Sequence, residues 1–426
     1  MPLKLALIGC GGIASNRHIP GYATIKQHEP DLFDLVAVCD ANRASAEAAA
    51  RTASEWQSSP PKIYTDVAQL LQSEKLDAAD ICTPHFLHHT VGIQCMEAGV
   101  SVQIEKPVGV TAKATQQLIA ASKRTRKILA TAENIRRMPG PRTTHWLFHE
   151  KGTLGQPIAL YSQRVQTRRP NNRAPAQPER RALGGGGQGA AHGTAGEGSP
   201  EHPQWVWRND VSMSGGGPVM DSGAHFCDTI RYLYGDVESC YGRVWQVNER
   251  HAWKGDDLVR IETEDTFMAT INFANGATGT WSVSTQLPGQ QFANVVYYGA
   301  NGAIVEQNDP FHGPRVTATV VLKDGTSRPL EEYYKEYLTS LGDKGRQKVF
   351  PHGIEDGFAL EIYDFLTAVR DGRPPEIDGD LGLRAKAIAL AIYESNATGQ
   401  VVRVQDVLDG KVNAYQGPIN EKWGIK

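Results

Sequence analysis

Cysteine is scarce in this chain, and its few copies are not closely paired. The six cysteines among 426 residues form no C-x-x-C motif, and four of them lie in or beside apolar, strand-like runs. Cysteines in such places usually behave as small apolar side chains of a core. We therefore expect buried, reduced thiols and no disulfide framework.

Two further features are missing. No apolar run approaches the ~18 residues that a membrane-spanning helix requires. Neither sign of charge dominates, because 44 basic residues face 47 acidic ones, and a net charge of −3 gives no electrostatic argument for nucleic-acid binding. The first strand-like run begins at Leu3, which leaves no room for a signal peptide ahead of it. These absences predict a soluble, cytoplasmic protein that binds neither nucleic acid nor membrane.

The length predicts two domains, and a 40% share of apolar residues is enough for sizeable cores. In the first third of the chain, short apolar runs alternate with helical patterns, which is typical of a parallel sheet with crossover helices. Strands are expected at residues 3–8, 35–39, 79–83, 101–104 and 128–131, and helices at residues 45–51, 67–72, 90–97 and 111–123.

From about residue 155 the apolar runs become longer and alternate with polar residues. Turn sequences such as Asn275-Gly276 and Asn301-Gly302 separate some of these runs, which indicates antiparallel hairpins. The rest of the chain therefore predicts an α+β domain on an open, mostly antiparallel sheet. Strands are expected at residues 158–165, 237–247, 265–273, 277–285 and 294–298, and helices at residues 357–370 and 382–395.

Residues 168–204 break this pattern. They are rich in Arg, Pro, Gly and Gln and hold few apolar side chains, so they cannot form a core of their own. We expect an irregular or mobile loop, with a lid over the following segment as the alternative.

A glycine-rich turn, Gly9-Cys10-Gly11-Gly12-Ile13-Ala14, follows the first predicted strand directly. In a strand–turn–helix unit, Gly9 permits the tight turn and Gly11 lets the backbone approach a pyrophosphate, while a small Ala14 lets the helix pack on the strand. The helix start then offers free N–H groups to the phosphates. We predict a Rossmann dinucleotide-binding domain over residues 1–135, followed by the α+β domain over residues 136–426. The turn residues expected at the cofactor are Gly9, Gly11, Gly12, Ile13 and Ala14.

Asp40 ends the second predicted strand and bears on the choice of cofactor. A carboxylate at this place accepts hydrogen bonds from both ribose hydroxyls and repels a 2′-phosphate, so NAD is favoured over NADP. Asp40 lies 26 residues beyond Ala14, a longer interval than usual, which a loop at residues 28–31 would explain. Arg43 either contacts a phosphate or is a solvated surface charge.

A second group of chemically capable residues follows the triple glycine Gly215-Gly216-Gly217. Asp221 and His225 are four residues apart and share a face if this segment is helical. Lys106, in Glu105-Lys106-Pro107, follows the strand expected at 101–104. Taken alone, the first two residues are as well explained by a structural hydrogen bond, and the lysine by a surface pair with Glu105.

The motifs occur in an order that resembles the Gfo/Idh/MocA family, named after glucose–fructose oxidoreductase, inositol dehydrogenase and MocA. The resemblance covers nearly the whole chain, and only the insertion at residues 168–204 departs from the commoner pattern. The segments that carry it are Gly9 to Ala14, Thr83-Pro84 with His88, Glu105-Lys106-Pro107, Glu133 to Arg137, Gly152 to Gly155, and Gly215 to His225.

The resemblance implies a role for each group. Lys106 and His225 would handle the proton of a substrate hydroxyl, and Asp221 would orient the substrate or hold the imidazole in one tautomer. It also implies a cis Lys106–Pro107 bond. Further cofactor contacts are expected from Asp40, Arg43, Thr83, Pro84, His88, Glu105, Lys106 and Asn134. Substrate contacts are expected from Lys106, Arg136, Trp207, Arg208, Asp221 and His225.

Some neighbouring residues receive a structural interpretation. His85, His88 and His89 suggest a metal site, but no Asp, Glu or Cys nearby completes a ligand set, so we expect no metal. His88 is instead expected to line the nicotinamide ribose. Asp228 is expected to tie its helix to a neighbour, and Trp207 either stacks on a sugar or packs in the core.

We therefore predict an NAD-dependent oxidoreductase that acts on a secondary hydroxyl of a sugar, glycoside or cyclitol. Two alternatives remain open: a glycoside-cleaving enzyme that oxidises, eliminates and re-reduces with held NAD, and a non-catalytic NAD-binding regulatory protein. The predicted strands between Val237 and Tyr298 carry apolar residues on both alternations, so we expect the open sheet to be buried in a homodimer or homotetramer.

Overall fold

The computed structural model describes residues 1–166, 203–307 and 312–426. The loop or lid expected at residues 168–204 therefore lies almost wholly outside the described residues. The first part of the chain forms a parallel sheet in the order β3-β2-β1-β4-β5-β6, as the strand–helix alternation predicted. Its strands are β1 (Leu3–Ile8), β2 (Phe33–Cys39), β3 (Lys62–Tyr64), β4 (Ala78–Ile81), β5 (Ser101–Glu105) and β6 (Leu129–Ala132).

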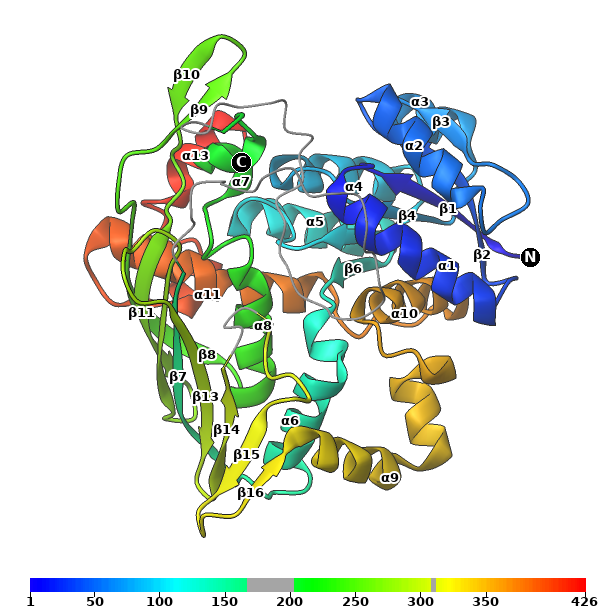
Figure 1. Cartoon of the computed structure of the whole chain (residues 1–426). Coiled ribbons are helices and arrows are strands. Elements are labelled where there is room, and N and C mark those ends of the chain that lie inside the picture. The colour runs from blue at the N-terminus through cyan, green and yellow to red at the C-terminus, as the bar shows by residue number, and fades with distance from the viewer. Residues whose placement is uncertain (167–202, 308–311) are drawn as a thin grey trace.

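Helices cover both faces of this sheet (Figure 1). One face carries α1 and α2, and the other carries α3, α4 and α5. A helix from the far end of the sequence, α10 (Gly357–Asp371), packs beside α1, and its Ile362, Phe365 and Leu366 join the same apolar core. The chain thus returns to the first sheet late in the sequence. The other helices are α1 (Ile19–His28), α2 (Arg43–Ala53), α3 (Val67–Ser73), α4 (His88–Glu97) and α5 (Ala112–Thr125).

The second sheet has the order β16-β15-β14-β13-β7-β12-β11-β8-β17. All neighbours in it are antiparallel except β7 and β12, so the expectation of an open, mostly antiparallel sheet is confirmed. Its strands are β7 (Pro157–Val165), β8 (Val237–Trp245), β11 (Thr266–Phe273), β12 (Thr278–Ser284), β13 (Phe292–Gly299), β14 (Gly302–Glu306), β15 (Thr319–Leu322), β16 (Ser327–Pro329) and β17 (Val402–Arg403). A separate hairpin joins β9 (His251–Lys254) and β10 (Asp257–Arg260).

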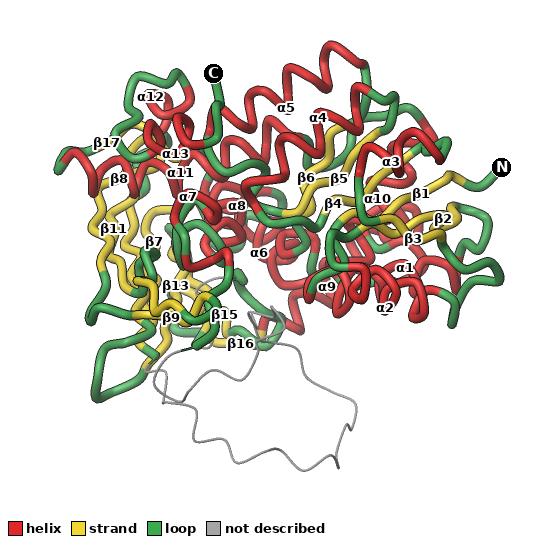
Figure 2. Tube along the Cα trace, turned by 90° about the horizontal axis from the view of Figure 1, so that it is seen from above, coloured by secondary structure: helices red, strands yellow, loops and turns green. Residues whose placement is uncertain are grey.

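Helices lie on one face of the second sheet (Figure 2). Phe226 of α8 (Gly223–Tyr234) packs against Trp281 of β12 with ring centroids 4.8 Å apart, and α11 (Gly379–Thr398) contacts β8 and α8. Between these helices and the first sheet lies α6 (Pro139–His149). The remaining helices are α7 (Val211–Ser214), α9 (Leu330–Val349), α12 (Val404–Leu408) and α13 (Gln416–Lys422).

The opposite face of this sheet carries no helix of the described chain (Figure 1). Strand alternation places Phe267 and Ala269 under the helices and leaves Met268 between them 54% exposed. Tyr161 and Tyr241 lie on the open face with 51% and 45% exposure. Apolar residues therefore do not fill both alternations evenly, as the sequence suggested, because the open face mixes aromatic side chains with Thr, Ser and Gln.

Three smaller expectations can be compared with the structure. The loop expected at residues 28–31 is a short turn, because the first helix runs on to His28 through a π-helical segment, Ala14–His18. All six cysteines are buried and free, as expected. No helix of the described residues is long and apolar enough to cross a membrane.

Candidate active site

The motifs of the first domain meet at one edge of the parallel sheet. Gly9 follows β1, Asp40 follows β2, Thr83 follows β4 and Lys106 follows β5. Because parallel strands point the same way, their carboxyl ends share this edge, with the change of strand order between β1 and β4. Ligands of open α/β sheets bind at such a place.

The glycine turn fits a dinucleotide. Gly9 has a φ of +92°, and a Cβ there would lie 2.6 Å from the carbonyl carbon of Cys82, so only glycine is accommodated. At Gly11, by contrast, a Cβ would meet nothing within 4 Å, which leaves open space beside the main chain. Ala14 is fully buried against the sheet. The geometry agrees with the separate roles expected of these three residues.

Asp40 is tied to this turn. Its Oδ2 accepts a hydrogen bond from Cys10 N at 2.7 Å, and its Oδ1 accepts one from Asn42 N at 2.8 Å. A carboxylate has about four acceptor sites, so two remain for a ligand. Arg43 is exposed and pairs with Glu47 at 3.0 Å, which agrees with its interpretation as a surface charge.

Lys106 contacts Asp221 across the two domains. The Lys106–Pro107 bond is cis, as predicted. Lys106 Nζ donates to the main-chain oxygen of Asp221 at 3.1 Å and to its Oδ1 at 3.4 Å, while Arg208 Nε donates to Oδ2 at 2.9 Å. Burial alone would raise the pKa of Asp221, but the charges of Arg208 and Lys106 outweigh it and hold that pKa well below its usual value. The lysine is therefore not paired with Glu105.

His225 is held by Glu133 and not by Asp221. Its Nδ1 lies 2.9 Å from both carboxylate oxygens of Glu133. Helix α8 begins at Gly223, so Asp221 precedes it, and the four-residue spacing does not bring Asp221 to the imidazole. Burial lowers the pKa of His225, an effect that Glu133 opposes and Lys106 reinforces. The net direction favours a neutral imidazole.

The triple glycine fixes the approach to Asp221. Gly216 has a φ of +141°, and a Cβ there would lie 2.1 Å from the Tyr393 hydroxyl oxygen. The carboxylate of Glu264 accepts from Gly217 N at 2.8 Å and from Val219 N at 3.1 Å, and the Tyr393 hydroxyl donates to it at 2.6 Å. The loop is thereby fastened to two buried side chains of the second domain.

Three predicted contacts are corrected by the structure. His88 is fully buried, and its two ring nitrogens face the main-chain oxygens of Pro107 and Thr83 at 3.0 and 2.7 Å, so it supports the turn and does not line a ribose. Arg136 is 5% exposed and forms an ion pair with Asp228 at 3.4 Å, so it ties α8 to the turn after β6 and is not offered to a substrate. The expected structural role of Asp228 is thereby confirmed.

The third correction concerns Glu105, whose carboxylate faces a buried polar cluster. His18 donates from Nδ1 to Asp80 at 2.7 Å and from Nε2 to Glu105 at 2.9 Å. Burial opposes charge on this imidazole, yet Asp80 raises the pKa of His18 well above its usual value. Glu361 of α10 lies 4.0 Å from His18 Nε2, and its carboxylate has no hydrogen-bond partner among the described residues. These side chains are spaced closely enough to suggest a metal site, but both ring nitrogens already face carboxylates at hydrogen-bond distance.

The remaining candidates differ in what their side chains offer. Thr83 Oγ1 is buried and has no hydrogen-bond partner in the described parts of the chain, Pro84 is half-buried, and Asn134 is buried in the turn after β6. Trp207 and Arg208 form a half-buried wall, with the guanidinium 4.2 Å from the indole centroid. His85 completes the wall, since its ring meets Trp207 at 4.5 Å and its Nε2 lies 3.9 Å from Asp221 Oδ1.

The sequence reasoning missed Glu133 and His85 as members of this group. Each follows a strand of the parallel sheet at the edge where the other motifs lie, and that position was the available signal.

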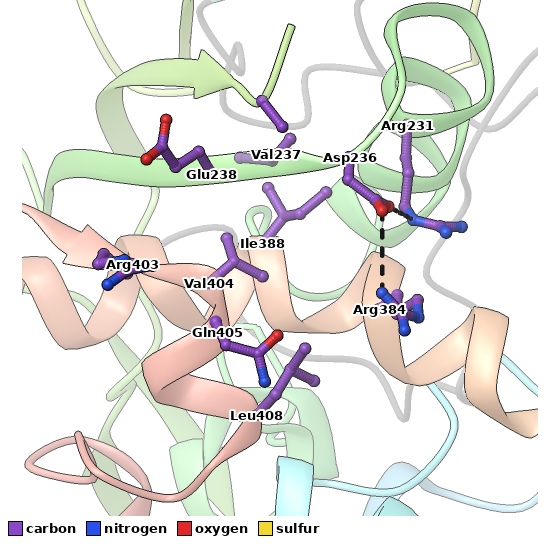
Figure 3. Close-up of a pocket in the computed structure, with 11 residues that line it drawn as sticks. Arg231, Asp236, Val237, Glu238, Arg384, Ile388, Arg403, Val404, Gln405 and Leu408 are labelled. Carbon is purple, nitrogen blue, oxygen red and sulfur yellow. Dashed lines mark hydrogen bonds and ion pairs between the residues drawn. The ribbon is translucent and has the colours of Figure 1, made fainter.

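A pocket of about 280 Å³ lies at the other end of α8 (Figure 3). Arg231, Arg384 and Arg403 line it, but Asp236 accepts a hydrogen bond from Arg231 at 2.7 Å and lies 3.8 Å from Arg384. It contains none of the residues that the motifs point to. The strand ends are therefore the better candidate for chemistry.

Comparison with known families agrees with this geometry. The sequence model of an oxidoreductase family with an NAD-binding Rossmann fold, Gfo/Idh/MocA, matches residues 3–133, and that of the Gfo/Idh/MocA C-terminal domain matches residues 189–305. The two matches together span more than half of the chain. The chain belongs to the Gfo/Idh/MocA oxidoreductase family.

Several curated relatives of the chain are dehydrogenases of sugars or cyclitols. The chain is 26% identical to D-glucoside 3-dehydrogenase of Escherichia coli, over 70% of this chain and 75% of the relative. It is 25% identical to levoglucosan dehydrogenase of Pseudarthrobacter phenanthrenivorans, over 95% and 99%. It is 24% identical to myo-inositol 2-dehydrogenase of Thermotoga maritima, over 82% and 85%.

Solved structures share the fold across nearly the whole length. Levoglucosan dehydrogenase in complex with NADH and levoglucosan has a TM-score of 0.69 at 22% identity, covering 95% of this chain and all of that one. The WlbA dehydrogenase from Bordetella pertussis, in complex with NADH and UDP-GlcNAcA, has a TM-score of 0.66 at 20% identity, covering 95% and 99%.

Proposed function

We propose that the protein is an NAD-dependent oxidoreductase that acts on a secondary hydroxyl of a sugar, glycoside or cyclitol. The observation that carries the proposal is the meeting of Lys106 with the Asp221–His225 segment at the carboxyl edge of the Rossmann sheet. A dinucleotide and a proton-transfer group are thereby brought to one place. The sugar and cyclitol dehydrogenases among the relatives support the substrate class.

The glycine turn and Asp40 would hold the dinucleotide. Gly11 has open space beside it for the pyrophosphate, and the two remaining acceptor sites of Asp40 suit the two ribose hydroxyls. A negative charge at this position disfavours a 2′-phosphate, which supports NAD over NADP. When bound, the nicotinamide supplies the hydride acceptor.

The protein's own groups would handle the proton. Nε2 of His225 has no hydrogen-bond partner among the described residues, and the lowered pKa of this imidazole keeps it ready to accept a proton from a hydroxyl. Lys106 spends its hydrogen bonds on Asp221 alone, so a third N–H remains to stabilise negative charge on the substrate oxygen. Asp221 fixes the direction of the lysine, and Trp207 with Arg208 offers an aromatic surface to a sugar ring.

A panel of sugars, glycosides and cyclitols tests the proposal. The protein is incubated with NAD⁺ and each compound, and both NADH absorbance and sugar release are followed. NADH formation without cleavage supports the proposal. Sugar release without net NADH supports the glycoside-cleaving alternative, and NAD⁺ binding without either product supports the regulatory one.

We also propose that the open face of the second sheet is buried in a homodimer or homotetramer. Tyr161 and Tyr298 meet edge to face there with centroids 5.9 Å apart, and Met268 is more than half exposed. Aromatic side chains and Met are enriched at the cores of protein interfaces. Light scattering at micromolar concentration gives the mass, and a monodisperse monomer would refute the proposal.

A further inference from the structure

We infer that Glu133 is the positioning residue of His225: its carboxylate holds the imidazole in the tautomer that leaves Nε2 unprotonated toward the substrate. The inference rests on the proposed function for its catalytic consequence, but the tautomer is a property of the protein alone. Neither the motif spacing nor the relatives assign this role to Glu133.

The main chain anchors the carboxylate of Glu133. Glu133 directly follows β6 and is 2% exposed, and its Oε1 accepts a hydrogen bond from Ile135 N at 2.9 Å. Helix α10 closes over the same turn, because a Cβ at Gly357 would lie 2.5 Å from Asn134 O. The carboxylate therefore has little freedom to leave the position in which the structure places it.

The imidazole of His225 meets this carboxylate with one nitrogen only. Nδ1 lies 2.9 Å from both Oε1 and Oε2, and an ionised carboxylate can only accept, so Nδ1 must carry the hydrogen. Burial raises the pKa of Glu133, but the facing imidazole outweighs it, so the net shift is downward and the carboxylate is ionised at neutral pH. A neutral imidazole has one N–H, which leaves Nε2 as the base.

Asp221 cannot take over this role. Both of its carboxylate oxygens are engaged, Oδ2 by Arg208 and Oδ1 by Lys106. The site therefore divides its two carboxylates: Asp221 directs the lysine, and Glu133 directs the histidine. A carboxylate behind a catalytic imidazole acts similarly in the serine-protease triad, where the amide replacement gives the wrong tautomer and a rate loss of about 10⁴.

Several charged groups lie around this pair and bear on its titration. Lys106, after β5, lowers the pKa of both members, and His312, between β14 and β15, lowers that of His225. The charge of Glu133 in turn raises the pKa of Asp228 on α8 and of Glu361 on α10. Removing the charge of Glu133 takes away the influence that raises the pKa of His225, so that pKa falls further.

The variant Glu133→Gln tests the inference. An amide cannot present two acceptors, so its NH₂ group competes with the Nδ1–H of His225 and the single tautomer is lost. We expect kcat to fall by about 10²- to 10⁴-fold, with the acidic limb of the pH–rate profile moving to lower pH. A purely structural defect would lower the rate without that movement.

Asp228→Asn is the matched control. Asp228 is buried on α8 one turn beyond His225, and no hydrogen bond or ion pair joins the two. It removes a carboxylate from the same helix but leaves the imidazole on Glu133. We expect its pH limb and its tautomer to match those of the wild type.

The tautomer itself is read without substrate. In protein labelled with ¹⁵N-histidine, two-bond proton–nitrogen correlations show which ring nitrogen carries the hydrogen, and His225→Gln identifies the signal. We expect Nδ1–H in the wild type above the pKa of the ring, and a mixture in Glu133→Gln. An Nε2–H wild type would overturn the inference even if Glu133→Gln did not fold, as would a variant with unchanged tautomer and kcat. A panel that yields no NADH would contradict the proposed function and leave this measurement intact.

Discussion

Replacing Asp40 by alanine should change which dinucleotide the protein prefers. Two of the carboxylate's acceptor sites hold Cys10 N and Asn42 N, and the other two suit the ribose hydroxyls. One hydrogen bond to a charged group contributes about 1.5–3 kcal/mol. Loss of one ribose contact therefore predicts a Kd for NAD⁺ about 10- to 150-fold higher, since about 1.4 kcal/mol corresponds to tenfold.

The ratio of the two affinities isolates the contribution of the charge. Asp40→Ala also loosens the glycine turn, because Cys10 N and Asn42 N lose their acceptors, and this weakens NAD⁺ and NADP⁺ alike. The negative charge near a 2′-phosphate disappears at the same time, which helps NADP⁺ only. We expect the NADP⁺-to-NAD⁺ ratio of Kd values, measured by titration calorimetry, to fall by at least the loss in NAD⁺ affinity that exceeds the shared effect.

Arg43→Ala is the control for this measurement. Its side chain is exposed and paired with Glu47, so we expect both Kd values to stay near those of the wild type. An unchanged ratio in Asp40→Ala would refute the placement of the ribose at this carboxylate. A large loss of NAD⁺ binding in Arg43→Ala would instead show that the arginine turns toward the cofactor.

Two further predictions concern stability and assembly. Burial raises the pKa of Glu361 well above its usual value, so the wild type loses stability as the pH rises from about 4.3, where the unfolded side chain ionises; urea melts should show Glu361→Gln gaining relative stability between pH 5 and pH 8, and an equal gap at both values would contradict this. Met268→Glu places a charge on the open sheet face and should reduce the mass seen by light scattering to that of a monomer, whereas Leu258→Glu on the separate hairpin should not; an unchanged mass in Met268→Glu would show that this face is not the interface.

The glycine turn, Asp40 and Lys106 were predictable because each belongs to a local motif at the end of a strand. The periodicity of the first third likewise gave five of the six parallel strands, and missed β3, which is only three residues long and has no fully buried side chain. The open sheet was predictable from the alternation of its longer strands and from two Asn-Gly turns. Local sequence carries these features because neighbouring residues create them.

The partner of His225 was not predictable in the same way. Glu133 and His225 are 92 residues apart and come from different domains, so no spacing rule joins them. The four-residue interval to Asp221 suggested a pair, but it requires a helix that already includes Asp221, and α8 begins two residues later. The packing of α10 beside α1 is equally non-local and places Glu361 against His18. These contacts follow from the tertiary arrangement and not from local pattern.

The central claim is that Lys106 and His225 handle the proton while the hydride leaves for NAD⁺. Single-turnover kinetics on a substrate found with the panel test it most directly, using Lys106→Ala, His225→Ala and the double variant. We predict that NAD⁺ binding stays close to the wild type, that each single variant slows hydride transfer by about 10²- to 10⁴-fold, and that the double variant loses less than the product of the two. Hydride transfer at a near-normal rate in His225→Ala would contradict the account.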